Sequence, residues 1–148
     1  MIVVEVLGTP APKGSARAFY KAGMKRAVVV KDNNERQRGW ESAVREAALA
    51  SVGERVGPVY VQRPVAVEIE FRLARPAGHW GTRGLKPSAP AAPANKPDAD
   101  KLARSTLDAL TGLAFDDDAR IVRLVVTKVY AAAGREGARI TIEEWRAR

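Results

Sequence analysis

The residues best suited to chemistry are six aspartates gathered in one short stretch of an otherwise basic protein. The 148-residue chain carries a formal charge of +8. Between residues 98 and 118, however, only Lys101 and Arg104 oppose Asp98, Asp100, Asp108, Asp116, Asp117 and Asp118. Carboxylates repel phosphates unless a cation lies between them, so an acidic focus in a basic chain indicates a divalent metal bound beside nucleic acid. The alternative interpretation is that these residues are helix caps and a surface turn.

The spacing of these aspartates suggests how they could share a metal ion. Asp98 and Asp100 are two residues apart, so in extended backbone their carboxylates point to the same side. Arg104 follows one helical turn later, and Asp116 and Asp117 come after a short turn. We expect the two acidic groups to converge at one edge of a sheet and to hold Mg²⁺ with open positions for water and phosphate. A calcium-binding loop is excluded because the stretch that begins at Asp98 lacks the third oxygen ligand and the glycine at the sixth position that such a loop requires.

The composition excludes several other chemistries. The chain has no cysteine, which rules out disulfides, thiolate metal sites and cysteine nucleophiles. Its one histidine, His79, argues against a Ser-His-Asp triad or a multi-histidine metal site, and its flexible surroundings predict a loop contact. No run of apolar residues is long enough to span a membrane and no secretory leader opens the chain, so we expect a cytoplasmic protein without a membrane partner.

The hydropathy pattern predicts an α+β fold in one domain covering residues 1–148. We expect two amphipathic helices over residues 35–51 and 100–110, packed against a mixed β-sheet. Strands are expected over residues 2–7, 27–30, 65–73, 120–130 and 139–145, with the last pairing antiparallel to 120–130. On strand 120–130, Val122, Leu124, Val126 and Tyr130 are expected to share one face. Trp40 and Trp145 are expected in the core.

Two segments outside the acidic stretch have features of a nucleic-acid surface. Residues 10–31 hold six cations and no acid, namely Lys13, Arg17, Lys21, Lys25, Arg26 and Lys31. Residues 76–97 contain five prolines, three glycines and five alanines, which predicts a long mobile loop. We expect the first segment to follow a DNA backbone and Trp80 in the second to stack on a base. The alternative is a solvated hairpin tip and a tryptophan that only anchors its loop.

The motifs in this order resemble the RusA-type Holliday-junction resolvases. The resemblance rests on the opening Gly8-Thr9-Pro10-Ala11-Pro12-Lys13-Gly14 with Arg17, and on a specific central part. That part comprises Lys96-Pro97-Asp98-Ala99-Asp100-Lys101-Leu102, Leu107-Asp108-Ala109-Leu110-Thr111-Gly112, Phe115-Asp116-Asp117, and Val122 to Tyr130 with Lys128. The resemblance implies a small homodimeric endonuclease, often encoded by phages or prophages. Such an enzyme uses Mg²⁺, with Mn²⁺ able to substitute, to cut four-way DNA junctions symmetrically during recombination and repair.

The resemblance also assigns site residues. The family's three essential aspartates fall on Asp98, Asp100 and Asp117, and Asp116 is an adjacent acid that would assist in metal binding. The family's active-site lysine falls on Arg104, which keeps the positive charge but cannot act as a base. Lys101 stands where the family often has asparagine. Together with Lys96, Lys101 adds positive charge for nucleic-acid binding beside the site.

Two other functions remain open at the level of sequence. A non-catalytic protein that binds branched DNA would carry the same basic segments, and only the three carboxylates argue against it. A Mg²⁺-dependent nuclease acting on flaps or forks would carry the carboxylates as well. Mapping nicks in four-way, forked and duplex DNA would separate all three.

Overall fold

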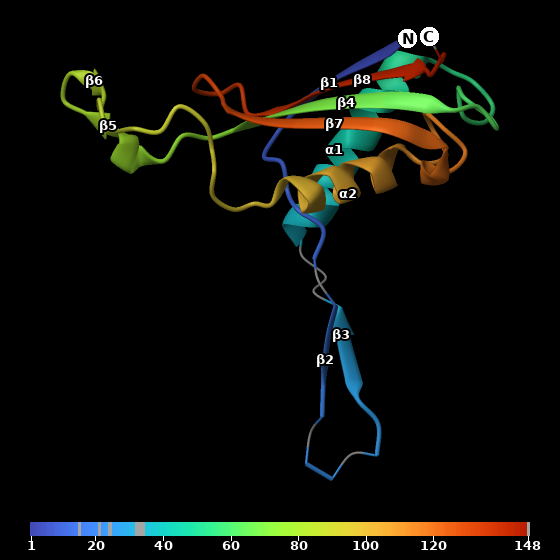
Figure 1. The fold of residues 1–148 in the computed structure, drawn as a ribbon, viewed down its shortest axis with the longest axis horizontal. Coiled ribbons are helices and arrows are strands. Elements are labelled where there is room, and N and C mark those ends of the chain that lie inside the picture. Colours follow the sequence, from blue (N-terminus) through green and yellow to red (C-terminus); the bar gives the residue numbers. More distant parts are fainter. Residues whose placement is uncertain (15, 21, 24, 32–34, 148) are drawn as a thin grey trace.

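The structure is a computed structural model that describes residues 1–14, 16–20, 22–23, 25–31 and 35–147. It has the predicted α+β architecture, in which both main helices lie on the same side of a four-stranded sheet (Figure 1). The sheet comprises β1 (Ile2–Leu7), β4 (Val65–Leu73), β7 (Ile121–Tyr130) and β8 (Gly137–Glu144). The helices are α1 (Glu35–Val52) and α2 (Ala99–Leu110). No helix in the described ranges is long and apolar enough to cross a membrane.

The order of strands in the sheet is β1-β8-β4-β7. β8 is antiparallel to both of its neighbours, whereas β7 runs parallel to β4 at one edge. The predicted pairing of the last strand with residues 120–130 is therefore wrong, because β4 lies between β8 and β7. β8 instead fills the space between β1 and β4. The pairing is close at Gly137, where a Cβ would lie 1.8 Å from the carbonyl oxygen of Val6.

Alternation along the strands separates a buried face from a solvated one. The buried face is aliphatic and aromatic, and the largest side chains that it contributes are Val4, Ile69, Phe71, Ile140 and Ile142. The solvated face carries charged pairs, such as the Arg72 guanidinium, which contacts Glu5 and Glu70. The helices pack on the buried face, where the rings of Trp40 and Phe71 lie 6.3 Å apart. This apolar layer fixes the position of α2.

Two apolar predictions fail for physical reasons. The shared face predicted for strand 120–130 fails at Val122, which is 56 % exposed, whereas Leu124, Val126 and Tyr130 keep it, although Leu124 is 44 % exposed. An irregularity in the β4–β7 register skips Val122, and β7 is an edge strand of the sheet that the structure describes. Trp145 is likewise 41 % exposed, since it follows the end of β8, whereas Trp40 is buried as predicted.

The remaining short elements lie in the two segments that the sequence marks as loops. Strands β2 (Ala16–Phe19) and β3 (Val28–Lys31) form a separate antiparallel hairpin. Residues 76–97 form a loop but are not without structure, since they contain the turn η1 (Ala77–His79) and a two-residue hairpin of β5 (Trp80–Gly81) and β6 (Gly84–Leu85). A last turn, η2 (Asp118–Arg120), precedes β7.

Candidate active site and nucleic-acid interface

Asp98 and Asp100 lie at the beginning of α2. Asp98 occupies the N-cap position with extended backbone, and its carboxylate makes no capping hydrogen bond to the helix. That carboxylate lies 3.8 Å from the Lys101 ammonium, and both side chains are partly exposed. Asp100 is exposed in the first turn. The partial positive charge of a helix N-terminus favours carboxylates there, and both groups are accessible to solvent.

Asp116 and Asp117 lie beyond the other end of α2. Asp117 accepts a hydrogen bond of 2.8 Å from the backbone N–H of Ala119 and so caps η2. Asp116 accepts bonds from the Arg120 guanidinium and from the backbone N–H of Gln62. Partial desolvation acts to raise the pKa of Asp116, but the bonds from Arg120 and Gln62 outweigh it and hold that pKa below its usual value. Asp116 is thus a carboxylate already occupied by structural partners.

A single chain does not bring the two acidic groups together. α2 has 12 residues and is therefore about 18 Å long, with Asp98 at its beginning and Asp117 past its end. Among the residues that the structure describes, no group of three or more Asp, Glu or His side chains could hold a metal ion. The expected convergence at one sheet edge is not met. A strand that follows a helix through a short turn begins where the helix ends, so β7 starts far from the first turn of α2.

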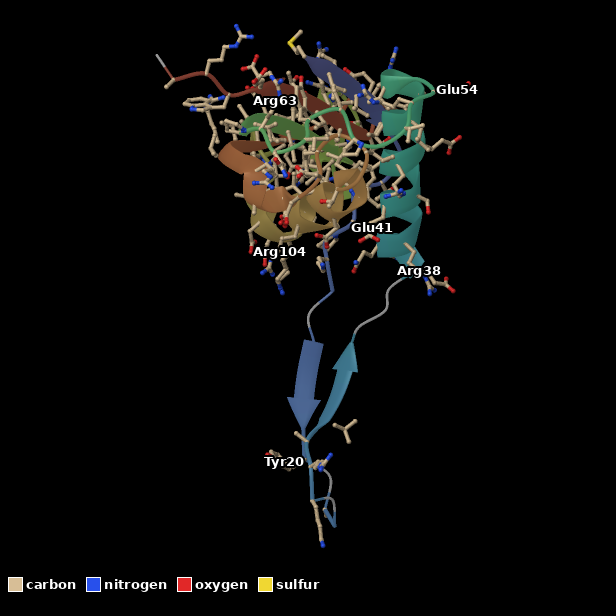
Figure 2. All side chains as sticks on the ribbon, turned by 90° about the vertical axis from the view of Figure 1, so that its right-hand side faces the viewer. Tyr20, Arg38, Glu41, Glu54, Arg63 and Arg104 are labelled. Atoms are coloured by element: carbon tan, nitrogen blue, oxygen red, sulfur yellow. The ribbon has the colours of Figure 1, made fainter. Side chains whose placement is uncertain are left out.

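The outer face of α2 carries cations between the two acidic groups. Arg104 projects from this face, which Figure 2 shows below the sheet. Arg104 and Lys101 line a hollow of about 480 Å³ together with Lys13, Asp108 and Asp118. The Lys13 ammonium contacts the Asp108 carboxylate, so one predicted DNA-binding cation is paired within the chain. Arg104 remains placed to meet an anion that approaches α2.

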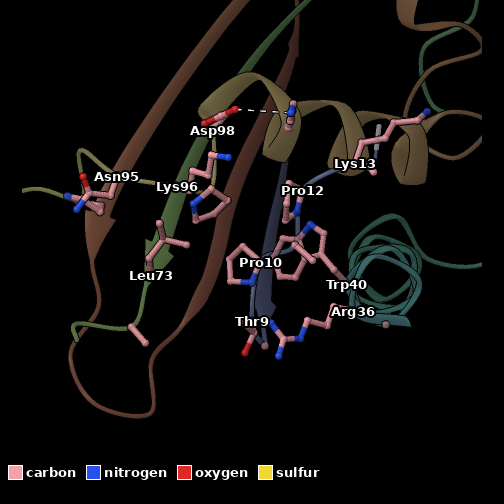
Figure 3. A pocket seen from close by; sticks show the side chains of 18 of the residues that line it. Thr9, Pro10, Pro12, Lys13, Arg36, Trp40, Leu73, Asn95, Lys96 and Asp98 are labelled. Atoms are coloured by element: carbon pink, nitrogen blue, oxygen red, sulfur yellow. Dashed lines mark ion pairs between the residues drawn. The ribbon is translucent and has the colours of Figure 1, made fainter. Parts of the chain in front are cut away.

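A larger groove opens beside Asp98. Its volume is about 1100 Å³, and it runs between the segment of residues 8–14, the beginning of α1 and the segment that precedes α2. Figure 3 shows Asp98 and Lys13 toward one end, Thr9 and Arg36 toward the other, and Pro10 and Trp40 between them. The groove reaches the first of the two acidic groups.

Of the other predicted nucleic-acid residues, Lys96, Trp80 and Arg17 lie in three different places. Lys96 lines the groove. Trp80 is 53 % exposed in the β5–β6 hairpin, where it pairs with Leu85. Arg17 is on β2, but its side chain and the whole of Lys21 lie outside the described residues. The exposed Tyr20 marks the same hairpin in Figure 2.

Sequence reasoning missed the side chains that hold the segment before α2. The Lys128 ammonium donates to the carbonyls of Asn95 and Pro97 at 2.8 and 2.9 Å. Alternation along β7 was a usable signal, because it places Lys128 on the same face as Val126 and Tyr130. Lys128 thereby ties the backbone next to Asp98 to the sheet.

A second set of missed residues anchors the loop of residues 76–97. The Arg75 guanidinium lies 4.0 Å from the centre of the Tyr130 ring, and the His79 ring meets that ring edge-on at 5.6 Å. Arg75 also donates to the carbonyl of Pro90. His79 is thus a loop contact, as predicted, and no pattern in the sequence points to its partner.

A basic α+β domain with exposed carboxylates at both ends of a cation-bearing helix has the general features of a protein that processes nucleic acid. The sequence model of the family described as endodeoxyribonuclease RusA matches residues 9–143, nearly the whole chain. The chain therefore belongs to the RusA endodeoxyribonuclease family. A search of curated proteins found no match. The matched range includes both acidic groups and, apart from Gly8, the residues that line the groove.

Proposed function

We propose that the protein is a Mg²⁺-dependent endodeoxyribonuclease that resolves four-way DNA junctions by paired, symmetric phosphodiester hydrolysis in recombination or repair. The observation that carries this proposal is the family match over residues 9–143. The solvent-accessible carboxylates of Asp98, Asp100 and Asp117 support it, because they stand where the family pattern has its essential acids. Mn²⁺ is expected to substitute for Mg²⁺, since both ions prefer oxygen ligands.

The carboxylates within one chain do not fit a metal ion, as their positions at opposite ends of α2 make clear. The proposed activity therefore requires two copies of the chain. In a symmetric dimer, the beginning of α2 in one protomer can meet the end of α2 in its partner, which would bring Asp98 and Asp100 of one copy to Asp117 of the other. These three carboxylates would together hold the divalent ion, which would provide an activated water and neutralise charge on the phosphate.

The side chains on α2 have roles that do not depend on the metal. Arg104 presents a planar, positively charged guanidinium suited to two oxygens of a phosphate. Lys101 adds positive charge next to Asp98, where the phosphate would otherwise be repelled. Both therefore serve to bind and orient the phosphodiester.

The first test compares a variant at a proposed metal-binding aspartate with a control variant at another aspartate of α2. Asp100→Asn should abolish nicking of a labelled four-way junction in Mg²⁺ while binding stays the same or tightens, because one negative charge is removed. Asp108→Asn is the control, since Asp108 is also exposed on α2 but contacts Lys13. Near-normal nicking by the Asp100 variant would overturn the assignment.

Substrate choice is tested with the same protein on four-way, forked and duplex DNA, each with Mg²⁺ or EDTA. Symmetric nicks confined to the four-way junction are the expected result. Nicks confined to forks or flaps would replace the proposed substrate. Tight binding of branched DNA with no nicks would favour a non-catalytic binding protein.

A further inference from the structure

The groove beside Asp98 has fixed walls. On one side, the backbone N–H of Lys13 donates to the carbonyl of Lys101, and the Ser105 hydroxyl donates to the carbonyl of Ala11 at 2.6 Å. The backbone N–H of Gly14 donates to the Gln37 side chain on α1. These bonds attach residues 11–14 to both helices. The groove is therefore present before any ligand arrives.

The opposite wall is held equally well. Lys128 ties the backbone at Asn95 and Pro97 to β7. Tyr130, which lines the groove, is covered by the Arg75 guanidinium. A ligand thus meets a preformed surface and does not have to order it.

The lining combines an apolar interior with a charged rim. Pro10, Trp40, Leu73 and Tyr130 supply flat or apolar surface, and Trp40 is only 2 % exposed, so it forms part of the floor. Lys96 and Lys101 stand at the end nearest Asp98. This arrangement suits a molecule with a planar apolar body and an attached anion. A volume of about 1100 Å³ is ample for such a body, because small-molecule sites usually span roughly 300–1000 Å³.

We propose that this groove takes up one unpaired nucleotide of the DNA strand next to the phosphate that is cut. The base lies against the proline, leucine and aromatic side chains, and its phosphate lies at the end with Lys96, Lys101 and Asp98. A base in a continuous duplex cannot enter the groove without losing its pairing and stacking. A base at a branch point is less well paired and stacked, so its entry costs less free energy. The groove thereby selects branched DNA. This inference rests on the proposed function and names a subsite for it.

Gly39 offers a way to fill the groove without touching a proposed catalytic residue. It lies on α1 and lines the groove, and a Cβ added there would meet no side chain or neighbouring segment of the described structure within 4 Å. Gly39→Leu therefore narrows the groove and also improves helix propensity. Ala50→Leu is the matched control, because Ala50 is exposed on the same helix about three turns further along. Circular dichroism of each variant checks that the fold is kept.

The experiment uses four-way junctions in EDTA with 2-aminopurine placed in turn at each position flanking the crossover. For the wild-type protein, one position should give a rise in fluorescence that acrylamide does not quench, because the base is unstacked yet enclosed. Gly39→Leu should abolish that shielded rise and weaken junction binding roughly tenfold, with duplex binding unchanged. Ala50→Leu should match the wild type.

The results separate this inference from the proposed function. A shielded rise lost only in the Gly39 variant supports the nucleotide site, even if no metal ion supports nicking and the nuclease proposal fails. Junction nicking by a wild-type protein that gives no shielded rise at any position overturns the nucleotide site and leaves the nuclease intact. An unchanged affinity and rise in the Gly39 variant also overturns it.

Discussion

The separation of the two acidic groups along α2 leads to a sharp prediction about mixed dimers. If each site takes Asp98 and Asp100 from one protomer and Asp117 from its partner, then homodimers of Asp100→Asn and of Asp117→Asn are both inactive. A heterodimer of the two variants concentrates both substitutions in one site and leaves the other site with all its carboxylates. About 18 Å of helix prevents one chain from supplying both groups.

The nicking activity expected of the heterodimer follows from its number of intact sites. One intact site of two gives about half the wild-type rate of first-strand nicking, and the product is a nicked junction because the second cut is missing. The assay is nicking by heterodimers purified through two different affinity tags after co-expression. A heterodimer of Asp98→Asn with Asp100→Asn is the control, since each of its sites lacks one carboxylate. Activity no greater than that of the two homodimers would refute a site shared between protomers.

Three further predictions concern stability and the segments around the site. Trp40→Phe removes a buried hydrogen bond of 3.0 Å to a threonine of α2 and should lower the free energy of unfolding, measured in urea, by about 2 kcal/mol. Trp145→Phe, at an exposed position, should change that free energy by less than about 0.5 kcal/mol. The pKa of Tyr60 is raised above its usual value of 10.0 by burial and by two glutamates of β8, so its contribution to stability is complete below pH 10 and is lost as pH rises through the higher pKa. Ultraviolet titration should show one late tyrosine ionisation that Tyr60→Phe abolishes. Lys128→Met removes two bonds to the backbone before Asp98, and it should speed proteolysis of that segment and slow junction nicking; an unchanged cleavage pattern would contradict its anchoring role.

The sequence predicts the elements of this fold better than their arrangement. Residues 65–73 alternate strictly, so the strand and its buried face are both found. The position of β8 between β1 and β4 is not found, because local hydropathy does not encode which strand is the neighbour. The exposure of Val122 has a similar cause, since it depends on a register irregularity against β4.

The candidate site likewise has features that the sequence predicts and features that it does not. The start of α2 and the exposure of Asp100 follow from the helical pattern after Pro97. The distance from Asp100 to Asp117 depends on the direction of β7 relative to α2. The order of the elements implies that direction, but the number of residues between the two aspartates does not show it. The contacts of Lys13 with Asp108 and of Arg75 with Tyr130 join distant parts of the chain and leave no local signal.

The central position of β8 bears on how the chain acquires its structure during synthesis. β1 is translated before every other strand of the main sheet, yet its partner there is β8, residues 137–144, which follows it by more than a hundred residues. Until then β1 and, once it has been translated, one edge of β4 lack their partner, so the nascent polypeptide carries open strand edges until residues 137–144 emerge. Insertion of β8 closes both edges at once, so β1 is expected to join the β4–β7 pair in a single late step.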